Sequence, residues 1–324
     1  MSDPRQELLR QMAALRKSLD PKVVERLDLA TEGKVPYDRE TAQSAVRQFL
    51  GNIREVDAIV HVLRCFEDDD ITHVEGGIDP IRDAETVETE LMLADMDGLE
   101  RRLNAMQKKA KGGDKEAKAS ADMMERALAA LQAGRPARTL EVSADELPLF
   151  KSLLLLTGKP VVFVCNVEEE SAATGNALSA KVAEMAKAQG AASVVVSAAI
   201  ESEVAQLTDE AEKKEFLETL GLDEPGLNRV IRAGYELLDL ITFFTVGPKE
   251  ARAWTVHRNA KAPEAAGVIH SDFERGFIRA ETIDYNSFVT LGGEQAAKEA
   301  GKMRQEVKEY VVQDGDIFHF RFNV

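Results

Sequence analysis

The 324-residue sequence predicts an α/β protein that has a parallel sheet, an inserted helical hairpin and a smaller mixed domain at its C-terminal end. Short apolar runs alternate with helical patterns up to residue 239, which is typical of a parallel sheet. The stretch from Ile81 to Ala133 is helical throughout and separates the first of these runs from the others. Beyond residue 240, short strands with alternating polar and apolar side chains indicate a second domain.

Composition narrows the class of protein. The chain is 44% hydrophobic and 30% charged, as in a folded globular protein. The start MSDPRQELLRQ is polar, and no apolar run approaches the roughly 20 residues that cross a bilayer. We therefore expect a cytoplasmic protein with no membrane partner. Cys65 and Cys165 lie in or at the end of apolar runs, which favours two buried, reduced thiols over a disulfide scaffold or a four-cysteine zinc site.

The charge is unevenly spread. The net charge of −16 should repel nucleic acid, so we expect no DNA partner. Residues 240–324 carry 11 Lys and Arg against 12 Asp and Glu, a balance of −1, so residues 1–239 carry the remaining −15. The C-terminal domain is therefore the part least disfavoured for contact with RNA.

The N-terminal residues 1–47 are predicted to be helical. Asp3 followed by Pro4 is a good helix start. Leu8, Met12 and Leu15 then recur at helical spacing, and a further helix is expected over Arg39–Leu50. This segment shows only amphipathic packing.

The sheet is predicted from apolar runs rich in β-branched residues. Three buried strands are expected, at Glu55–Arg64, Pro160–Cys165 and Ala192–Ser197. The helices predicted beside them are Glu146–Leu156, Leu178–Gln189 and Leu227–Leu238. Acidic residues 67–70 after the first strand are expected to form a solvated loop.

A helical hairpin is predicted between the first two strands. Apolar side chains form one stripe, made of Leu91, Leu93, Met96, Leu99 and Leu103, and a second stripe follows, made of Met123, Met124, Leu128 and Leu131. The charged segment Lys108–Lys118, with Gly112 and Gly113 inside it, interrupts the helical pattern. Two amphipathic helices joined by such a turn are typical of a hairpin that projects from the body of the protein.

The C-terminal domain is predicted from strands at Ile241–Val246, Glu250–Val256, Gly276–Glu281 and Ile317–Val324. In the last strand, Phe318, Phe320 and Phe322 share one face while His319, Arg321 and Asn323 share the other. The sequence Asp314-Gly315 predicts the turn before it. With one predicted helix, Gly293–Lys302, this pattern favours a small mixed domain such as a β-grasp.

Five long segments of the sequence are distinctive when taken together: GNIREVDAIVHVLRCFEDDDITHVEGGIDPIRD (51–83), KKAKGGDKEAKA (108–119), KPVVFVCNVEE (159–169), AAGVIHSDFERGFIRAE (265–281) and YVVQDGDIFHFRFNV (310–324). In this order they resemble the YchF branch of the Obg-like ATPases. The resemblance implies a partial P-loop NTPase domain of the OBG type over 48–87 and 141–239. It further implies that the inserted coiled-coil hairpin spans 88–140 and that a TGS domain of β-grasp fold spans 240–324. Residues 1–47 do not resemble the family.

The resemblance also implies a site for a nucleotide base. Family members contact the base with Asn-x-x-Glu after a strand, which matches Asn166, Val167 and Glu169 here, and with a backbone amide of a Ser-Ala pair, which matches Ser197-Ala198-Ala199. Relatives that bind GTP have an Asp whose carboxylate accepts the two donors of guanine, and adenine lacks those donors. ATP is therefore the implied ligand. Without the family context, Asn-Val-Glu-Glu would be interpreted as a polar turn.

The sequence lacks the residues that would hold phosphates. A phosphate-binding loop needs Gly-x-x-x-x-Gly-Lys-Ser/Thr, and the three Gly-Lys pairs at Gly33, Gly158 and Gly301 are followed by Val, Pro and Met. The family's Mg²⁺ ligands are not found, and the matches to Asp-x-x-Gly at Asp95 and Asp223 are attributed to chance. We assign no catalytic residue and expect hydrolysis to be absent or very weak.

Two functions follow as hypotheses. The first is a ribosome-associated protein that binds ATP in preference to GTP with impaired hydrolysis. The second is a non-catalytic module that binds the ribosome or ribosomal RNA through the TGS domain and the hairpin. If the N-terminal strands of the NTPase sheet are missing, the strand around Ile59 becomes an apolar edge, which we expect the helices of residues 1–47 to cover.

Overall fold

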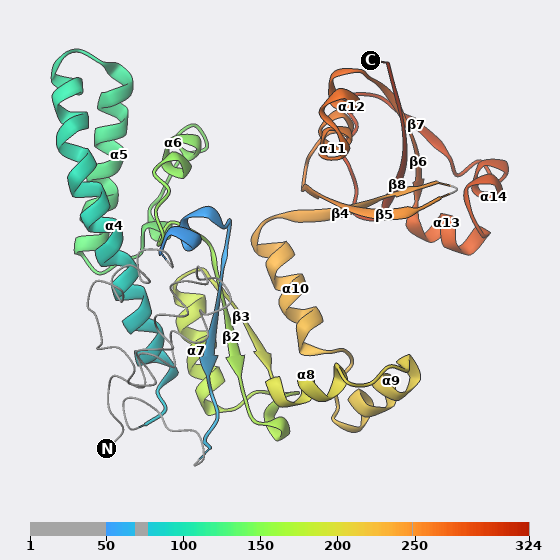
Figure 1. Ribbon diagram of the computed structural model, residues 1–324, viewed down its shortest axis with the longest axis horizontal. Helices are drawn as coiled ribbons and strands as arrows, with labels where there is room; N and C mark the ends of the chain where they lie inside the picture. The colour runs from blue at the N-terminus through green and yellow to red at the C-terminus, as the bar shows by residue number, and fades with distance from the viewer. Residues whose placement is uncertain (1–49, 69–76, 248, 324) are drawn as a thin grey trace, which may run out of the picture. The chain divides into compact units, whose positions relative to one another are not determined.

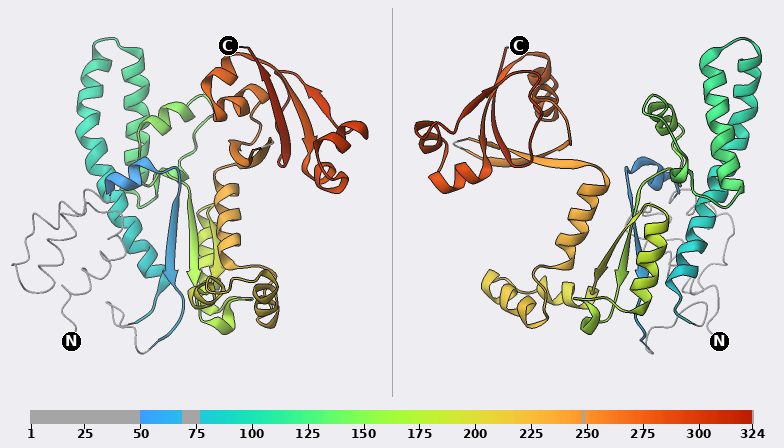
Figure 2. Two further views of the ribbon diagram at one scale, coloured as in Figure 1. Left: turned by 45° about the vertical axis from the view of Figure 1, so that its right-hand side comes forward. Right: turned by 180° about the vertical axis from the view of Figure 1, so that it is seen from behind.

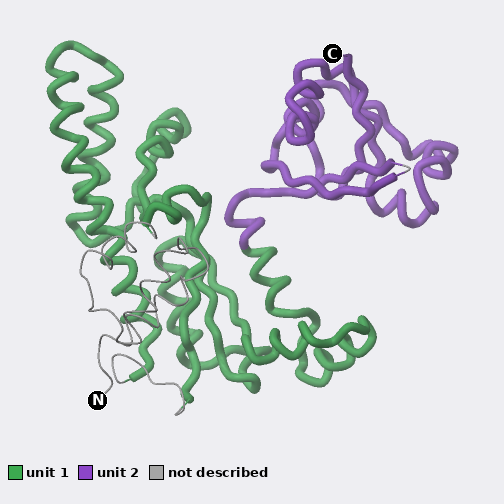
Figure 3. Tube along the Cα trace, viewed as in Figure 1, with its two compact units in different colours: residues 1–233 green, residues 234–324 purple. Residues whose placement is uncertain are grey.

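The computed structural model describes residues 50–68, 77–247 and 249–323 (Figure 1). The chain divides into two compact units, residues 1–233 and 234–324 (Figure 3), and each is described by itself. The predictions for residues 1–47 lie outside the described residues. Among the described residues, no helix combines the length and the apolar character that crossing a bilayer requires.

The first unit contains the predicted parallel sheet. Strands β1 (Ile59–Arg64), β2 (Val161–Asn166) and β3 (Ala192–Val196) pair in parallel in the order β1-β2-β3. Strand β2 is central and its residues are buried up to Asn166, as its continuous apolar run predicted. The prediction of an α/β fold with a parallel sheet is therefore confirmed.

One face of this sheet is covered by helices α4 (Pro80–Lys111) and α7 (Ala177–Ala188) (Figure 2). Their contact with the sheet buries a core that includes Leu63, Cys65, Ala84, Phe163, Cys165 and Val182. Both cysteines are fully buried free thiols, as predicted.

Strand β1 is an edge strand within the described part of the chain. Val60 and Val62, on the face opposite α4 and α7, are 53% and 61% exposed. This agrees with the predicted apolar edge. The proposed cover by the N-terminal helices falls on residues that the structure does not describe.

Helices α4 and α5 (Lys115–Gln132) form the predicted hairpin, side by side in Figure 1. The carboxylates of Asp79 and Asp114 cap their first turns. Gly113 has a positive φ of 92°, which explains a glycine in the connecting turn. One residue of the predicted stripe was wrong, since Leu93 is 52% exposed. Asp95 lies on the buried face instead.

The remaining elements of the first unit are short. They are η1 (Ala137–Thr139), α6 (Leu147–Ser152), η2 (Glu169–Ser171), α8 (Ala198–Val204) and α9 (Glu210–Thr219), and α10 (Gly226–Leu237) runs across the division between the units. Helix α6 is shorter than the predicted Glu146–Leu156. The chain leaves the helix because Leu154 adopts a φ of 53°, a left-handed conformation that a helix cannot contain.

The second unit is a five-stranded mixed sheet with short helices. Its strands, in the order β5-β4-β8-β6-β7, are β5 (Ala251–His257), β4 (Leu240–Val246), β8 (Asp316–Phe322), β6 (Phe277–Asp284) and β7 (Arg304–Glu306). Only the β4–β8 pair is parallel. The prediction of a single helix here was wrong. Four are present in the described residues, namely α11 (Ala262–Ile269), α12 (Ser271–Arg275), α13 (Tyr285–Leu291) and α14 (Glu294–Glu299).

Aromatic side chains form the core of the second unit. Phe243, Phe318 and Phe320 are buried and meet edge to face or stacked, with ring centroids 5.0–6.2 Å apart. The predicted alternation of β8 is confirmed, because His319 and Arg321 are exposed on its other face. At Gly276, a Cβ would lie 2.1 Å from the backbone oxygen of Asn323, so this close approach of two chain segments requires glycine.

Candidate functional site

The two segments predicted to contact a nucleotide base meet at the carboxyl end of the sheet. Asn166 is the last residue of β2, and Ser197 follows directly after β3. Because the strands are parallel, both residues lie at the same end of the sheet. The Asn166 side-chain oxygen accepts a hydrogen bond from the Ala198 backbone N–H at 2.9 Å. The structure therefore joins the predicted residues Asn166 and Ala198 directly.

Val167 ties these segments together through its backbone. Its N–H donates to the Val196 oxygen at 2.9 Å, which extends the ladder between β2 and β3 by one bond. Its side chain is 3% exposed and lies in the core cluster with Leu63 and Cys65. Val167 therefore anchors the segment after β2 to β3 and to the core, and its side chain does not reach the surface of the site.

The two glutamates after Val167 have different surroundings. Glu169, the predicted base contact, is exposed at the start of η2. Glu168 accepts hydrogen bonds from the Ser171 hydroxyl and from the Asn176 side-chain amide, the latter at 2.9 Å. The bond from Ser171 is the main cause that lowers the pKa of the Glu168 carboxyl; burial opposes it, and the bond from Asn176 adds a smaller lowering effect. Glu168 therefore organises the turn, a role that the sequence reasoning did not assign.

Asn176 fixes this turn to the rest of the sheet. Its side-chain oxygen caps the first turn of α7, and Ser179 completes a capping box. Its side-chain amide also donates to the Cys65 backbone oxygen, beyond β1, at 2.6 Å. The signal in the sequence was the Asn-x-x-Ser spacing before a helical pattern, which marks a helix start.

Ser197 and the two alanines provide the other half of the site. Ser197 is 3% exposed, and its hydroxyl has no hydrogen-bond partner among the residues that the structure describes. Ala198 and Ala199 are exposed and form the first turn of α8. Backbone N–H groups in a first helical turn have no acceptor within the helix, so the Ala199 N–H is available to a ligand. A buried polar group without a partner beside an exposed amide is the kind of feature that a bound molecule would complete.

A second carboxylate holds the helix that follows. Glu201 of α8 accepts hydrogen bonds from the N–H groups of Gly226 at 2.6 Å and Leu227 at 3.1 Å, at the start of α10. A Cβ on Gly226 would lie 2.9 Å from both the Glu201 carboxylate and the Val196 side chain. Neither role was predicted from the sequence, although an acid four residues after Ser197 and a glycine before a helix were visible signals.

The arrangement is suited to an uncharged, planar ligand edge. It offers the side-chain amide of Asn166, a backbone N–H and small exposed alanines, which fit the polar edge and the face of a base. Within residues 50–68, 77–247 and 249–323, no three metal-ligating side chains gather.

Known proteins show the same organisation. A family model for the C-terminal part of YchF GTPases, described as a protein of unknown function (DUF933), matches residues 240–323. The "Ribosome-binding ATPase YchF" of Haemophilus influenzae is 52% identical over the whole chain and 88% of its own length. The protein of the same name from Bacillus subtilis is 52% identical over 86% of this chain and 76% of its own.

A solved structure agrees with the sequence relatives. The structure of the Schizosaccharomyces pombe YchF GTPase superimposes with a TM-score of 0.74 at 35% identity, over 85% of this chain and 74% of that one. The alignment to the Haemophilus relative runs through residues 1–47 as well, while the boundaries predicted for that segment and for the domains stay predictions. The chain belongs to the YchF family.

Proposed function

We propose that the chain is a cytoplasmic, ribosome-associated protein that binds ATP in preference to GTP at the site formed by Asn166, Glu169 and Ser197–Ala199. The single observation that carries the proposal is the bond from the Ala198 N–H to the Asn166 side chain, which brings both predicted base contacts to one edge. The names of the bacterial relatives, ribosome-binding ATPases, support the partner and the ligand.

The proposed preference for adenine over guanine rests on Glu169, the last residue of the Asn-x-x-Glu motif. Guanine presents two adjacent N–H donors, which a short, fixed aspartate carboxylate satisfies together. Here the position holds Glu169, whose longer side chain is exposed in a 3-10 turn. A site without a placed acceptor for those donors loses its preference for guanine.

Hydrolysis by this 324-residue chain is expected to be absent or slow. The chain has no Gly-x-x-x-x-Gly-Lys-Ser/Thr segment, and such a loop normally cradles the phosphates and contributes a ligand to Mg²⁺. The residues of the site then bind and orient the base and have no step in bond cleavage.

Calorimetric titration of ATP and GTP into the purified chain tests the proposal. Asn166→Ala should weaken ATP binding about 5- to 10-fold, the value of one lost hydrogen bond. Ala199→Pro removes the backbone N–H, and a proline at the second helical position is tolerated in α11, which carries Pro263 there. The matched control, Ala199→Ser, keeps the N–H and should bind ATP as the unchanged chain does. Equal affinity of all four proteins would sink the proposal.

The basic tip of the hairpin favours a second candidate function, binding of the ribosome without any nucleotide. The tip of the hairpin, residues 108–118, is basic in a chain of net charge −16. It holds two acids and five exposed lysines, namely Lys108, Lys109, Lys111, Lys115 and Lys118. Such a basic tip suits the phosphates of ribosomal RNA, so the hairpin and the C-terminal unit would bind the ribosome without any nucleotide. Absence of ATP binding, together with RNA binding that weakens when these lysines become glutamine, would favour this module.

A further inference from the structure

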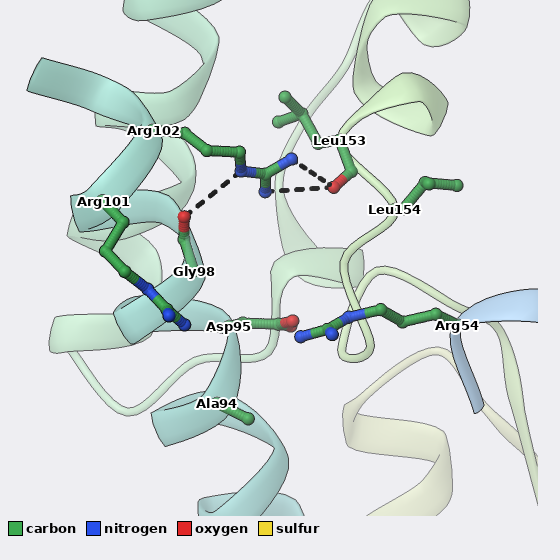
Figure 4. Close-up of a pocket in the computed structure, with 8 residues that line it drawn as sticks. All are labelled: Arg54, Ala94, Asp95, Gly98, Arg101, Arg102, Leu153 and Leu154. Atoms are coloured by element: carbon green, nitrogen blue, oxygen red, sulfur yellow. Dashed lines mark hydrogen bonds between the residues drawn. The ribbon is translucent and has the colours of Figure 1, made fainter. Parts of the chain in front are cut away.

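A pocket of about 350 Å³ lies at the amino end of the sheet, opposite the candidate base site (Figure 4). Arg54 precedes β1, and Leu153 and Leu154 precede β2, so both chain segments enter the sheet here. Strands of about six residues are roughly 20 Å long, which is the separation expected between the two ends. The pocket is therefore distinct from the site around Asn166.

Helix α4 supplies most of the pocket wall. The guanidinium of Arg102 donates two hydrogen bonds to the Leu153 backbone oxygen, both 3.1 Å, and one to the Gly98 oxygen at 3.2 Å. Carbonyl oxygens orient this guanidinium without cancelling its charge. Arg101 pairs at 2.6 Å with Asp97, but that pair is about 70% exposed and therefore weak.

Arg54 faces the carboxylate of Asp95. Its guanidinium is directed toward Asp95 (Figure 4) and attracts that carboxylate electrostatically, but among the described residues it makes no hydrogen bond or direct ion pair. Asp95 is 2% exposed, and its carboxylate is already occupied by the N–H groups of Leu156 and Thr157 and by the Thr157 hydroxyl, at 2.7–2.9 Å. The lining thus holds three guanidinium groups and one carboxylate that already accepts three hydrogen bonds.

We propose that this pocket binds a phosphate group, as a monoester or a diester, between Arg54 and the Arg101–Arg102 wall. Guanidinium groups bind phosphate oxygens in pairs, and the three guanidinium groups outnumber the carboxylates of Asp95 and Asp97 by one, which suits an anionic phosphate group. The pocket volume admits a phosphate with part of its parent molecule.

Two sources share this chemistry. One is a small phosphorylated metabolite. The other is the backbone of RNA, because α4 continues from Arg102 to the lysines of its last turn, and Lys108 lies about 9 Å further along the helix. A diester chain that occupies the pocket would therefore meet the basic tip as well.

The test measures binding of inorganic phosphate by calorimetry and binding of a short single-stranded RNA by fluorescence anisotropy. The full chain is compared with Arg54→Gln and Arg54→Lys, and Arg135→Gln serves as control because Arg135 is exposed and does not line the pocket. Arg54→Gln should weaken phosphate binding at least 10-fold, Arg54→Lys should restore part of it, and Arg135→Gln should change nothing. Melting curves without phosphate establish that each variant folds.

The outcomes separate the sources. Loss of both phosphate and RNA binding in Arg54→Gln supports the proposal with RNA as the source. Loss of phosphate binding alone supports it with a small phosphorylated compound. No phosphate binding by the unchanged chain, or equal binding by Arg54→Gln, overturns it. ATP binding that depends on Asn166 and not on Arg54 distinguishes this result from a failure of the proposed base site.

Discussion

The two ends of the three-stranded sheet differ in the kind of polar group that they present. At the carboxyl end, the edge formed by Asn166, Ser197 and the Ala199 N–H is neutral. Beside it, Glu168 accepts from Asn176, Glu201 accepts from Gly226, and Glu169 is exposed to solvent. At the amino end, three guanidinium groups surround one buried carboxylate. A neutral edge suits a base and a cationic pocket suits a phosphate, so the described residues offer a nucleotide's two kinds of recognition roughly 20 Å apart.

This separation has a consequence for ligand binding. A single nucleotide is too short to satisfy both ends, so a nucleotide at the carboxyl end gains base contacts alone from the described residues. The ends also differ in electrostatics. Burial raises the pKa of Asp95, against the opposing effect of its bonds from Thr157 and Leu156, whereas hydrogen bonds lower that of Glu168. At the amino end, Asp95 of the hairpin bonds to Thr157 before β2, and at the carboxyl end Glu168 bonds to Asn176 at the start of α7.

The largest expected effect is at the amino end. Asp95→Ala leaves the N–H groups of Leu156 and Thr157 and the Thr157 hydroxyl buried without an acceptor. Each unsatisfied group costs about 1–3 kcal/mol, so the free energy of unfolding should fall by about 3 kcal/mol or more. Urea denaturation measures this. The control Asp97→Ala removes only an exposed ion pair and should cost less than about 0.5 kcal/mol. Equal losses in both variants would contradict the assigned role of Asp95.

At the carboxyl end, Gly226→Ala should have the next largest effect. The added Cβ meets the Glu201 carboxylate and the Val196 side chain at 2.9 Å, and both must move. Overpacking of this kind costs about 1–3 kcal/mol in denaturant titrations. Gly234→Ala is the matched control in the same helix, since its Cβ meets nothing within 4 Å and should stabilise by up to about 1 kcal/mol. The account of this contact fails if Gly226→Ala is as stable as the unchanged chain.

Ser197→Ala sharpens the distinction between folding and binding. Within the described part of the chain its buried hydroxyl has no hydrogen-bond partner, so replacement should leave the free energy of unfolding unchanged or raise it by up to about 1 kcal/mol. If the hydroxyl serves a bound base, ATP affinity should fall in the same variant. Thermal melts and calorimetry on one preparation measure both. A clear loss of stability would show that Ser197 has a structural role.

The smallest effect concerns pH and Glu168. Its folded-state pKa lies below the ordinary 4.5, so the ionised carboxylate stabilises the fold above pH 4.5, and this contribution disappears as the pH falls through the lowered value. The stability difference between the unchanged chain and Glu168→Gln, below about 1 kcal/mol because the pair is near the surface, should therefore shrink on acidification. A difference that is constant from pH 7 to pH 3 would argue against the hydrogen bonds to Glu168.

The sequence predicted those parts of the fold whose signals are long. The apolar strands, the hairpin helices and the alternation of β8 were visible because each pattern extends over several residues. Helices such as α12 and α13 are five and seven residues long, too short for a helical period to show. Helix α6 ended early because of a backbone conformation at Leu154 that no residue type announces.

The residues of the candidate site could likewise be predicted only where they belong to a recognisable sequence pattern. Asn166 and Ser197–Ala199 were predicted because they belong to a motif, whereas the roles of Glu168, Glu201 and Arg54 depend on contacts between segments far apart in the sequence. Asp95 was dismissed as a chance match. Its position in the stripe between Leu91 and Leu99 was the overlooked signal, because an acid on a buried helical face must find donors elsewhere.

The most direct test compares ATP with adenosine. Both are titrated by calorimetry into the Arg54→Gln variant, so that the cationic pocket makes no contribution, and hydrolysis is followed in parallel with and without EDTA. If the site recognises the base and no part of the chain holds the phosphates, the two dissociation constants should agree within about 3-fold, with no EDTA-sensitive hydrolysis. ATP binding 100-fold tighter than adenosine, together with robust EDTA-sensitive turnover, would contradict the account.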